Sequence, residues 1–400
     1  MSEIDGEVKR GFEGVKDAFA NNFDQHADVG AAFSVYYRGE KVVDLWGGLA
    51  DSEANKPWAQ DSLQLVFSST KGATALMANL LAQRGELDFD APVAQYWPEF
   101  AAAGKENIPV RYLLSHQVGL PHIPPLTLEE SYTWEAPIKR LEAQSPAWEP
   151  GTKHGYHPGT YGWLVGEVIR RISGKTPGTF MAEEVSGPLG LDFWIGLPEK
   201  EEHRVTTVQS VDPRVDPLDE STLNEAQRNM IATAQIPDSL LALSMSVSPP
   251  ETDPNGRAFH ASEQPAGSGI TDARSLARMY ASLIGDGVDG IRLLNDETIR
   301  RATTELAGGI DAVMAVPTRF GLGFALNCPI APGFSEYSSL AGAMGNEGAF
   351  GHNGAGGSLG FADPTADFSF GYVMNQMHMV TVGDDPRTLS LINAVHQAIS

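Results

Sequence analysis

Strand-like segments at both ends of the 400-residue chain constrain its fold more than any other feature. Near the N-terminus, residues 31–37 have apolar side chains at alternate positions, and a short turn leads into a second apolar segment, 41–48, so we expect a hairpin. Near the C-terminus, residues 320–326, 358–362 and 368–375 also have strand character. This distribution predicts one antiparallel sheet built from both chain ends and flanked by helices, with a mostly helical domain inserted, an α/β (α+β) architecture.

Helical periodicity occupies much of the remaining chain. The clearest helices are predicted over residues 161–172, where Gly174 stops the helix, and after Thr271-Asp272, where a helix can start. We expect further helices around residues 7–21, 110–120 and 389–399.

These patterns predict two domains. A sheet domain would comprise residues 1–66 and 265–400, and a mostly helical domain would comprise residues 67–264. Residues 198–265 carry several prolines and little periodicity, apart from a possible helix over 223–234, so we expect this region to form long loops that line a pocket.

A serine and a lysine stand three residues apart, at Ser68 and Lys71, where the apolar periodicity of a helix begins. At that spacing they share one helix face and can touch, whereas Ser69 is turned toward the opposite side. A serine hydroxyl needs a neighbouring base to act as a nucleophile, and lysine can serve if burial keeps its amine neutral. Ser-x-x-Lys arises about once by chance in a chain of this length. Whether it marks a catalytic site therefore depends on partner residues elsewhere in the sequence.

Charge and cysteine content exclude several classes of function. The formal net charge is −23 with a pI near 4.7, which argues against nucleic acid or an anionic membrane as a partner. The single cysteine, Cys328, rules out an internal disulfide and a cysteine-rich metal site. The first residues include acids and no apolar core of a signal peptide, so we expect a cytoplasmic protein without a membrane span.

Three segments stand out in order along the chain. They are Ser68-Ser69-Thr70-Lys71, Gly155-Tyr156-His157-Pro158 and Gly351-His352-Asn353-Gly354-Ala355-Gly356-Gly357-Ser358. Together they resemble the family VIII carboxylesterases, which are related to class C β-lactamases and penicillin-binding proteins. The sequence around them is similar to that family as well, including residues 113–120, 162–171, 187–191 and 361–364. The resemblance covers nearly the whole chain and implies a β-lactamase/transpeptidase-like fold.

The resemblance also implies roles for individual residues. Ser68 would be the acylated nucleophile, Lys71 its partner on the helix, and Tyr156 a second base whose phenolate the lysine stabilises. The backbone N–H groups of Ser68 and Ala355 would form the oxyanion hole.

The same segments would bring four substrate-binding residues to the site. These are His157, Pro158, His352 and Gly354. Pro158 stands where β-lactamases carry the asparagine of Tyr-x-Asn, and His352 stands where they carry the lysine of Lys-Thr-Gly. Both departures remove contacts to β-lactams and favour neutral esters.

Three other patterns have competing interpretations. Residues 356–360 fit the Gly-x-Ser-x-Gly elbow of α/β-hydrolases, but strand-like sequence and a turn follow Ser358, where the elbow requires a helix. Residues 174–176 resemble the end of a phosphate loop, yet they close a helix. His154 and His157 could approach a metal, but no acidic or cysteine ligand accompanies them, so we expect no metal and no cofactor.

The sequence therefore predicts a serine carboxylesterase that hydrolyses small esters of short or medium acyl chain, as a monomer or homodimer. An amidase, a transesterase or a D-amino-acid peptidase remains open on the same scaffold, and so does a weak β-lactamase side activity. So does a non-catalytic, penicillin-binding-like scaffold protein.

Overall fold

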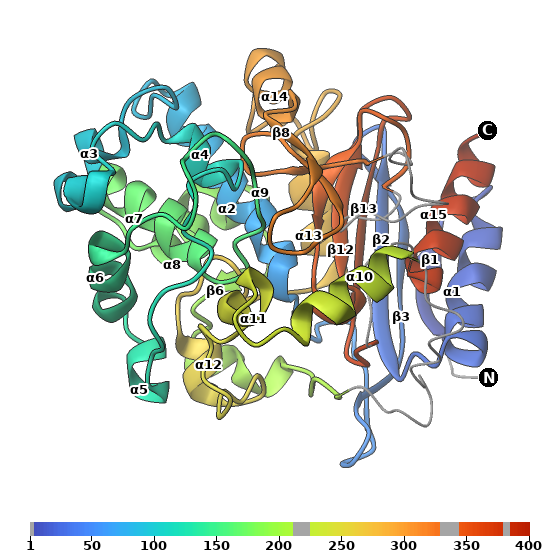
Figure 1. The fold of residues 1–400 in the computed structure, drawn as a ribbon. Coiled ribbons are helices and arrows are strands. Elements are labelled where there is room, and N and C mark those ends of the chain that lie inside the picture. Colours follow the sequence, from blue (N-terminus) through green and yellow to red (C-terminus); the bar gives the residue numbers. More distant parts are fainter. Residues whose placement is uncertain (1–3, 211–224, 329–343, 379–384) are drawn as a thin grey trace.

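The centre of the molecule is an antiparallel sheet to which both ends of the chain contribute, as predicted (Figure 1). The computed structural model describes residues 4–210, 225–328, 344–378 and 385–400. In spatial order the strands are β1 (Ile4–Val8), β3 (Glu40–Asp51), β2 (Gly30–Tyr37), β13 (Phe368–Met374), β12 (Leu359–Asp363), β11 (Phe350–Asn353), β10 (Ala325–Leu326), β9 (Pro317–Phe320) and β8 (Ala307–Ile310), and β4 (Lys56–Pro57) pairs with β3.

The pairing of β2 with β13 joins the two ends of the chain. In this pair Phe33 lies opposite Tyr372, and Val35 lies opposite Phe370. The rings of Phe33 and Phe370 also pack against each other, with centroids 4.8 Å apart. The alternating apolar side chains of β2 and β13 therefore share one buried face, as their sequence patterns predicted.

Helices cover both faces of the sheet. On one side α1 (Glu13–Gln25) and α15 (Pro386–Ile399) lie next to each other, at the right of Figure 1, and bury the face that carries Phe33 and Phe370. On the other side α13 (Ala273–Ala281) packs against β2, β12 and β13. Helix α13 lies between the sheet and most of the helical part of the molecule (Figure 1).

The remaining helices mostly belong to the inserted segment. The one that begins at the predicted nucleophile is the short turn η1 (Phe67–Ser69) followed by α2 (Thr70–Gln83). The others are α3 (Val93–Tyr96), η2 (Pro98–Gly104), α4 (Arg111–Leu114), α5 (Leu128–Ser131), α6 (Glu135–Ala143), α7 (Thr160–Ser173), α8 (Pro177–Phe180), η3 (Met181–Ser186), α9 (Gly187–Leu189), η4 (Glu199–Arg204), α10 (Glu225–Ala234), α11 (Leu240–Met245), α12 (Arg257–Ala261), α14 (Asp296–Thr303) and η5 (Ala355–Gly357). No helix among the described residues combines the length and apolar character needed to cross a membrane.

Some predicted elements differ from the structure. The helix expected over 7–21 begins only at Glu13, and residues 4–8 form an edge strand instead. The sequence did not reveal this strand because its middle residues are exposed and show no apolar alternation. The strand expected over 320–326 is divided between β9 and β10 by a glycine-containing turn. Helix α4 ends at Leu114, earlier than predicted. The predicted helix over 223–234 is present from Glu225, and its first two residues lie outside the described residues.

A small three-stranded sheet connects the two predicted domains. Its strands, in order, are β5 (Gln64–Leu65), β7 (Gly269–Thr271) and β6 (Phe193–Ile195). The first two come from the ranges assigned to the sheet domain, and β6 comes from the inserted segment. The boundaries at residues 66 and 265 stay a prediction.

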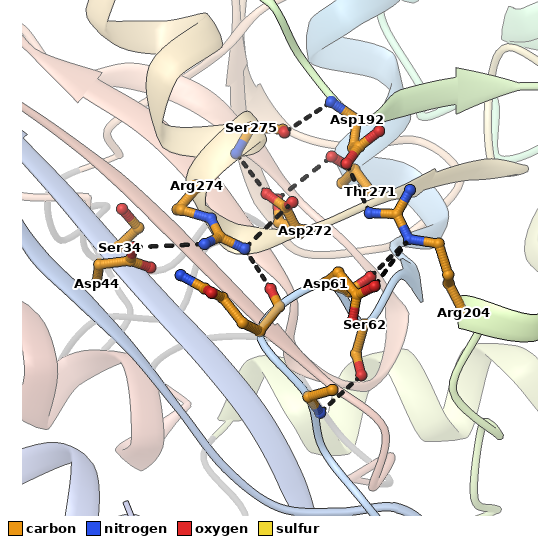
Figure 2. Close-up of polar contacts among 12 residues, drawn as sticks. Ser34, Asp44, Asp61, Ser62, Asp192, Arg204, Thr271, Asp272, Arg274 and Ser275 are labelled. Atoms are coloured by element: carbon orange, nitrogen blue, oxygen red, sulfur yellow. Dashed lines mark hydrogen bonds and ion pairs between the residues drawn. The ribbon is translucent and has the colours of Figure 1, made fainter. Parts of the chain in front are cut away.

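Charged side chains surround this connection, as Figure 2 shows. Arg204 at the end of η4 contacts Asp192 at 2.6 Å and Glu201 at 2.8 Å. Arg274 in α13 reaches Asp44 of β3 at 3.5 Å and also donates to the backbone carbonyl of Gln60. Arg204 thus holds η4 to the residue before β6, and Arg274 holds α13 to β3 and to the segment before β5.

Candidate active site

The predicted nucleophile lies on a strained turn. Phe67, the residue before Ser68, has a φ of +44°, a left-handed value that is unusual for a bulky side chain and is typical of functional sites. The hydroxyl of Thr70 donates to the Phe67 carbonyl at 2.5 Å and accepts from the Gly269 N–H at 2.9 Å. Strand β7 therefore holds the turn in place, and Ser68 remains partly accessible.

The structure brings Ser68 and Lys71 together. Lys71 Nζ lies 3.1 Å from Ser68 Oγ, as expected for two residues on one helix face. The neighbouring Ser69 is fully buried, and its hydroxyl lies 3.1 Å from that of Ser358. The geometry thus separates the two serines as the helical spacing predicted.

Lys71 is completely buried, and two backbone carbonyls accept from its amine. Pro158 O lies at 2.8 Å and Ala266 O at 2.9 Å. Burial holds the pKa of Lys71 well below its ordinary value of 10.5. A neutral amine has two N–H groups, and the two carbonyls can accept a hydrogen bond from each. The lone pair of the amine can then face Ser68.

A second buried lysine provides an internal comparison. Lys105 Nζ donates to three backbone carbonyls, those of Ala102, Glu142 and Gln144, at 2.7 to 2.9 Å. Three carbonyl acceptors suit the three donors of an ammonium group. At Lys71 the third carbonyl is replaced by the Ser68 hydroxyl, which can give up a proton.

Tyr156 reaches the same serine from the loop that precedes α7. Its phenol interacts with the Ser68 side chain, and Lys71 Nζ lies 4.8 Å from its ring centroid. Burial raises the pKa of Tyr156 far above its ordinary value of 10; the Ser68 side chain offsets part of this effect, and the charge of Asp311 adds to it. These influences favour a protonated phenol, so the electrostatics oppose the phenolate that the resemblance implied.

The predicted oxyanion segment follows β11 and lies against the nucleophile's turn. The Gly354 N–H donates to Ser358 O at 2.7 Å, which closes the turn that carries Ala355. A side chain at Gly354 would place its Cβ 2.2 Å from both Val66 O and Ser358 Oγ. Only glycine permits this close approach of the two segments.

Ser358 is buried and has a structural role. Its side chain is 1% exposed, and its hydroxyl donates to Val66 O at 2.9 Å. Strand β12 follows it directly, so the helix that an α/β-hydrolase elbow requires is absent at this position.

His352 is buried beside the site as a neutral imidazole. Its Nδ1 lies 2.7 Å from Asn353 O, and its ring centroid lies 6.0 Å from that of Tyr156. Burial lowers the pKa of His352 to about 3. It therefore cannot supply the positive charge of the lysine that it replaces. Pro158 contributes its carbonyl to Lys71 instead of a side-chain amide to substrate.

The other histidines of the loop are occupied by structural contacts. The Leu120 N–H donates to His157 Nε2 at 2.9 Å, and His157 Nδ1 lies 2.6 Å from Gly155 O, so both ring nitrogens are used. His154 Nε2 lies 2.8 Å from the Thr318 hydroxyl. These contacts show that His157 supports the loop, whereas its role toward substrate stays a prediction.

Sequence reasoning missed three groups at this site. They are the carbonyl of Ala266, the hydroxyl of Ser358 as a brace, and the carboxylate of Asp311, which accepts from the Tyr156 N–H. A backbone carbonyl has no residue-type signal, and Asp311 lies 155 positions away in the sequence. Only a spatial comparison could have identified them.

Comparisons with known proteins agree with this geometry. The family model described as "Beta-lactamase" matches residues 16–393. The chain is 38% identical to a family VIII carboxylesterase of known crystal structure, with a TM-score of 0.86 and coverage of 99% of this chain and 100% of the other. It is 36% identical to a penicillin-binding protein homologue from Caulobacter crescentus, with a TM-score of 0.83 and the same coverage. It is also 34% identical to the esterase/beta-lactamase LipL of Mycobacterium tuberculosis, over 92% of this chain and 81% of LipL.

Proposed function

This chain belongs to the beta-lactamase family and is a serine hydrolase of the carboxylesterase type, and on that premise we propose that it hydrolyses short- to medium-chain carboxylic esters through an acyl-enzyme on Ser68. The observation that carries the proposal is the pair of contacts on Ser68. Lys71 Nζ lies 3.1 Å from its hydroxyl, and the phenol of Tyr156 interacts with the same side chain. A nucleophile, a base and a second proton carrier therefore converge on one oxygen.

Acylation begins with a proton transfer from Ser68 to the neutral Lys71 as Ser68 Oγ attacks the ester carbonyl. The negative charge that develops on the carbonyl oxygen is stabilised by the N–H groups of Ser68 and Ala355. Tyr156 is protonated, so it donates its proton to the departing alcohol, and Lys71 returns a proton to the phenol.

Deacylation repeats these steps with water in place of the serine. Water attacks the acyl carbonyl, Lys71 accepts its proton, and Ser68 leaves with a proton delivered through the same pair. The two carbonyls on Lys71 support this cycle, because they keep the amine fixed in either protonation state.

The surroundings of Ser68 favour esters over penicillins. The carboxylate of a β-lactam would lie near the uncharged His352. The side-chain amide of the β-lactam would lie near Pro158, which has no side-chain amide to bind it. A neutral ester requires neither contact. The apolar cluster around Tyr156, which contains Trp148, Leu241 and Met314, suits an uncharged substrate.

An ester panel tests this proposal. The purified protein should hydrolyse p-nitrophenyl acetate and butyrate, and anilides of the same acids should react far more slowly. Ser68→Ala should lower kcat by roughly three orders of magnitude or more while circular dichroism shows intact folding. Near-normal turnover by folded Ser68→Ala would disprove the acyl-enzyme on this residue.

A covalent label separates Ser68 from Ser358. A fluorophosphonate should modify the peptide that contains Ser68, and peptide mapping by mass spectrometry would locate the adduct. Ser358→Ala should keep ester hydrolysis within about tenfold of wild type, a loss of no more than about 1.4 kcal/mol, because this hydroxyl braces the turn and carries no acyl group. An adduct on Ser358 with Ser68 unmodified would reverse the assignment.

A further inference from the structure

The turn between β8 and β9 brings a buried carboxylate to the backbone of Tyr156. Asp311 is 1% exposed, and the Tyr156 N–H lies 2.8 Å from one carboxylate oxygen and 3.0 Å from the other. The two residues come from different parts of the fold, since Asp311 follows an edge strand of the sheet and Tyr156 precedes α7 of the inserted segment.

Asp311 also organises its own turn. The N–H groups of Val313 and Met314 donate to one carboxylate oxygen at 2.9 and 2.8 Å, and the Thr318 hydroxyl donates to the other at 3.2 Å. An aspartate that only caps a turn needs such local bonds and no others. The bond to Tyr156 is additional and reaches across the molecule.

Two further contacts fasten the same segments together. The Ala312 N–H donates to His154 O at 3.0 Å, and the ring of His154 contacts the Thr318 hydroxyl at 2.8 Å. Residues 311–318 and 154–156 are thus joined along their length, with Asp311 at the end nearest the phenol-bearing residue.

We infer that Asp311 is a positioning residue for acyl transfer: its carboxylate fixes the backbone of Tyr156 and so holds the phenol in its place at Ser68. The inference rests on the proposed function, because it concerns the same Ser68, Lys71 and Tyr156 site.

The charge of Asp311 must be weighed against every ionisable group that faces Tyr156. These groups are Lys71 from α2, His116 after α4, His352 from β11 and Tyr161 from α7, and His154 and His157 flank Tyr156 in its own loop. Burial lowers the pKa of Lys71 and of all four of these histidines, which favours their neutral forms. Asp311 acts in the same direction as burial and raises the pKa of Tyr156, because a nearby negative charge opposes formation of the phenolate.

Asp311→Asn removes this charge with little change in shape. Asp363→Asn is the matched control, because Asp363 is also fully buried at a strand end and accepts from the N–H groups of Asn346, Thr365 and Ala366 at 2.9 to 3.0 Å. We expect Asp311→Asn to lower kcat for p-nitrophenyl butyrate by about ten- to a hundredfold with KM within about threefold. Asp363→Asn should leave kcat per folded molecule unchanged.

The ionisation of Tyr156 provides a readout that needs no turnover. Protein labelled with [13Cζ]tyrosine is titrated by NMR, and the Tyr156 signal is identified by its loss in Tyr156→Phe. Tyr156 should stay protonated to at least about pH 10 in wild type and in Asp363→Asn, and should ionise about one to two pH units earlier in Asp311→Asn than in wild type. Asp311→Glu, which restores the charge, should move the titration back toward wild type.

The outcomes separate the inference from the proposed function. An unchanged Tyr156 titration in folded Asp311→Asn, with kcat reduced no more than in Asp363→Asn, would overturn the inference while esterase activity stands. If Asp311→Asn does not fold, ionisation of Tyr156 below about pH 8 in wild type would overturn it. Absence of ester hydrolysis and of Ser68 labelling in wild type, with the titration shift present, would instead refute the proposed function.

Discussion

Lys71 shows how the surroundings of one residue decide its chemistry. Lys71 and Lys105 are both buried, and burial lowers the pKa of each. Lys105 has three carbonyl acceptors, whereas Lys71 has two carbonyls and the Ser68 hydroxyl. The third partner decides the role of each lysine. A third carbonyl suits a structural ammonium at Lys105, whereas the Ser68 hydroxyl places the amine of Lys71 to accept a proton.

The pH profile follows from these pKa directions. Because the active form of Lys71 carries no extra proton, kcat/KM for an ester should rise with pH as Lys71 is deprotonated, with a midpoint well below 10.5. The raised pKa of Tyr156 means that this residue should cause no decline below about pH 10. Stopped-flow hydrolysis of p-nitrophenyl butyrate from pH 5 to about pH 10 would measure the profile. An acid limb that persists in the residual activity of Lys71→Ala would assign it to another group.

Substrate preference depends on His352 at the same scale. With a pKa of about 3, His352 is uncharged at neutral pH and cannot attract a carboxylate. We expect kcat/KM for benzylpenicillin or a cephalosporin to be at least about a hundredfold below that for p-nitrophenyl butyrate, because about 3 kcal/mol of ionic contact is missing. His352→Lys should narrow this gap. Equal values for the two substrate classes in wild type would contradict the prediction.

Helix α7 illustrates what holds an element in place. Its length follows from the sequence, since Gly174 ends it with a left-handed φ of +69°. Its attachment depends on Glu167, whose side chain is fully buried and accepts from Trp134 before α6, and from Arg170 and Arg171. Burial by itself would raise the pKa of Glu167, but these bonds outweigh burial and hold the pKa below its ordinary value of 4.5.

Glu167→Gln should therefore reduce stability in a pH-dependent way. At pH 7 we expect the free energy of unfolding to fall by about 2 to 4 kcal/mol, because a buried charged partner of two arginines is removed. A lowered carboxyl pKa stabilises the fold above pH 4.5, and this contribution is lost as the pH falls through the folded-state value. Urea denaturation should therefore show a larger difference between the variant and wild type at pH 7 than at pH 3.5.

Glu184→Gln serves as the control for this measurement. Glu184 is partly exposed and pairs with Arg84 and Lys175 on the surface, so its loss should cost less than about 1 kcal/mol. A difference between Glu167→Gln and wild type that is equally large at both pH values would refute the assignment to the carboxylate's charge.

At the scale of the whole molecule, charged side chains around the small sheet link the inserted segment to the large sheet (Figure 2). Arg204 is mostly buried there and contacts Asp192 and Glu201, and it also donates to the Asp61 carbonyl. Arg204→Met should lower the free energy of unfolding by about 1 to 3 kcal/mol, because it leaves these acceptors without their partner. The kcat per folded molecule should stay near wild type, since Arg204 does not contact Ser68, Lys71 or Tyr156.

Lys9→Met is the matched surface change for that experiment. The Lys9–Glu40 pair is exposed, so its loss should be nearly neutral. Thermal unfolding would measure stability, and titration of active sites with a fluorophosphonate would give kcat per folded molecule. Equal midpoints for Arg204→Met and Lys9→Met would show that the network contributes no stability.

The sequence by itself determined the features that depend on local periodicity. The alternation in residues 31–37 and 368–375 predicted two central strands, and the helical spacing after Ser68 put this residue and Lys71 on one face. Such patterns are readable because side chains repeat every second residue in a strand and every 3.6 residues in a helix.

Only the tertiary structure decided which distant groups meet. The carbonyls of Pro158 and Ala266 lie 87 and 195 positions from Lys71, and a carbonyl is the same for every residue type. The carboxylate of Asp311 resembles any other turn aspartate in the sequence until the fold places it against Tyr156. The protonation states of Lys71 and Tyr156 were likewise hidden, because they depend on burial and neighbouring charge, which the order of residues does not specify.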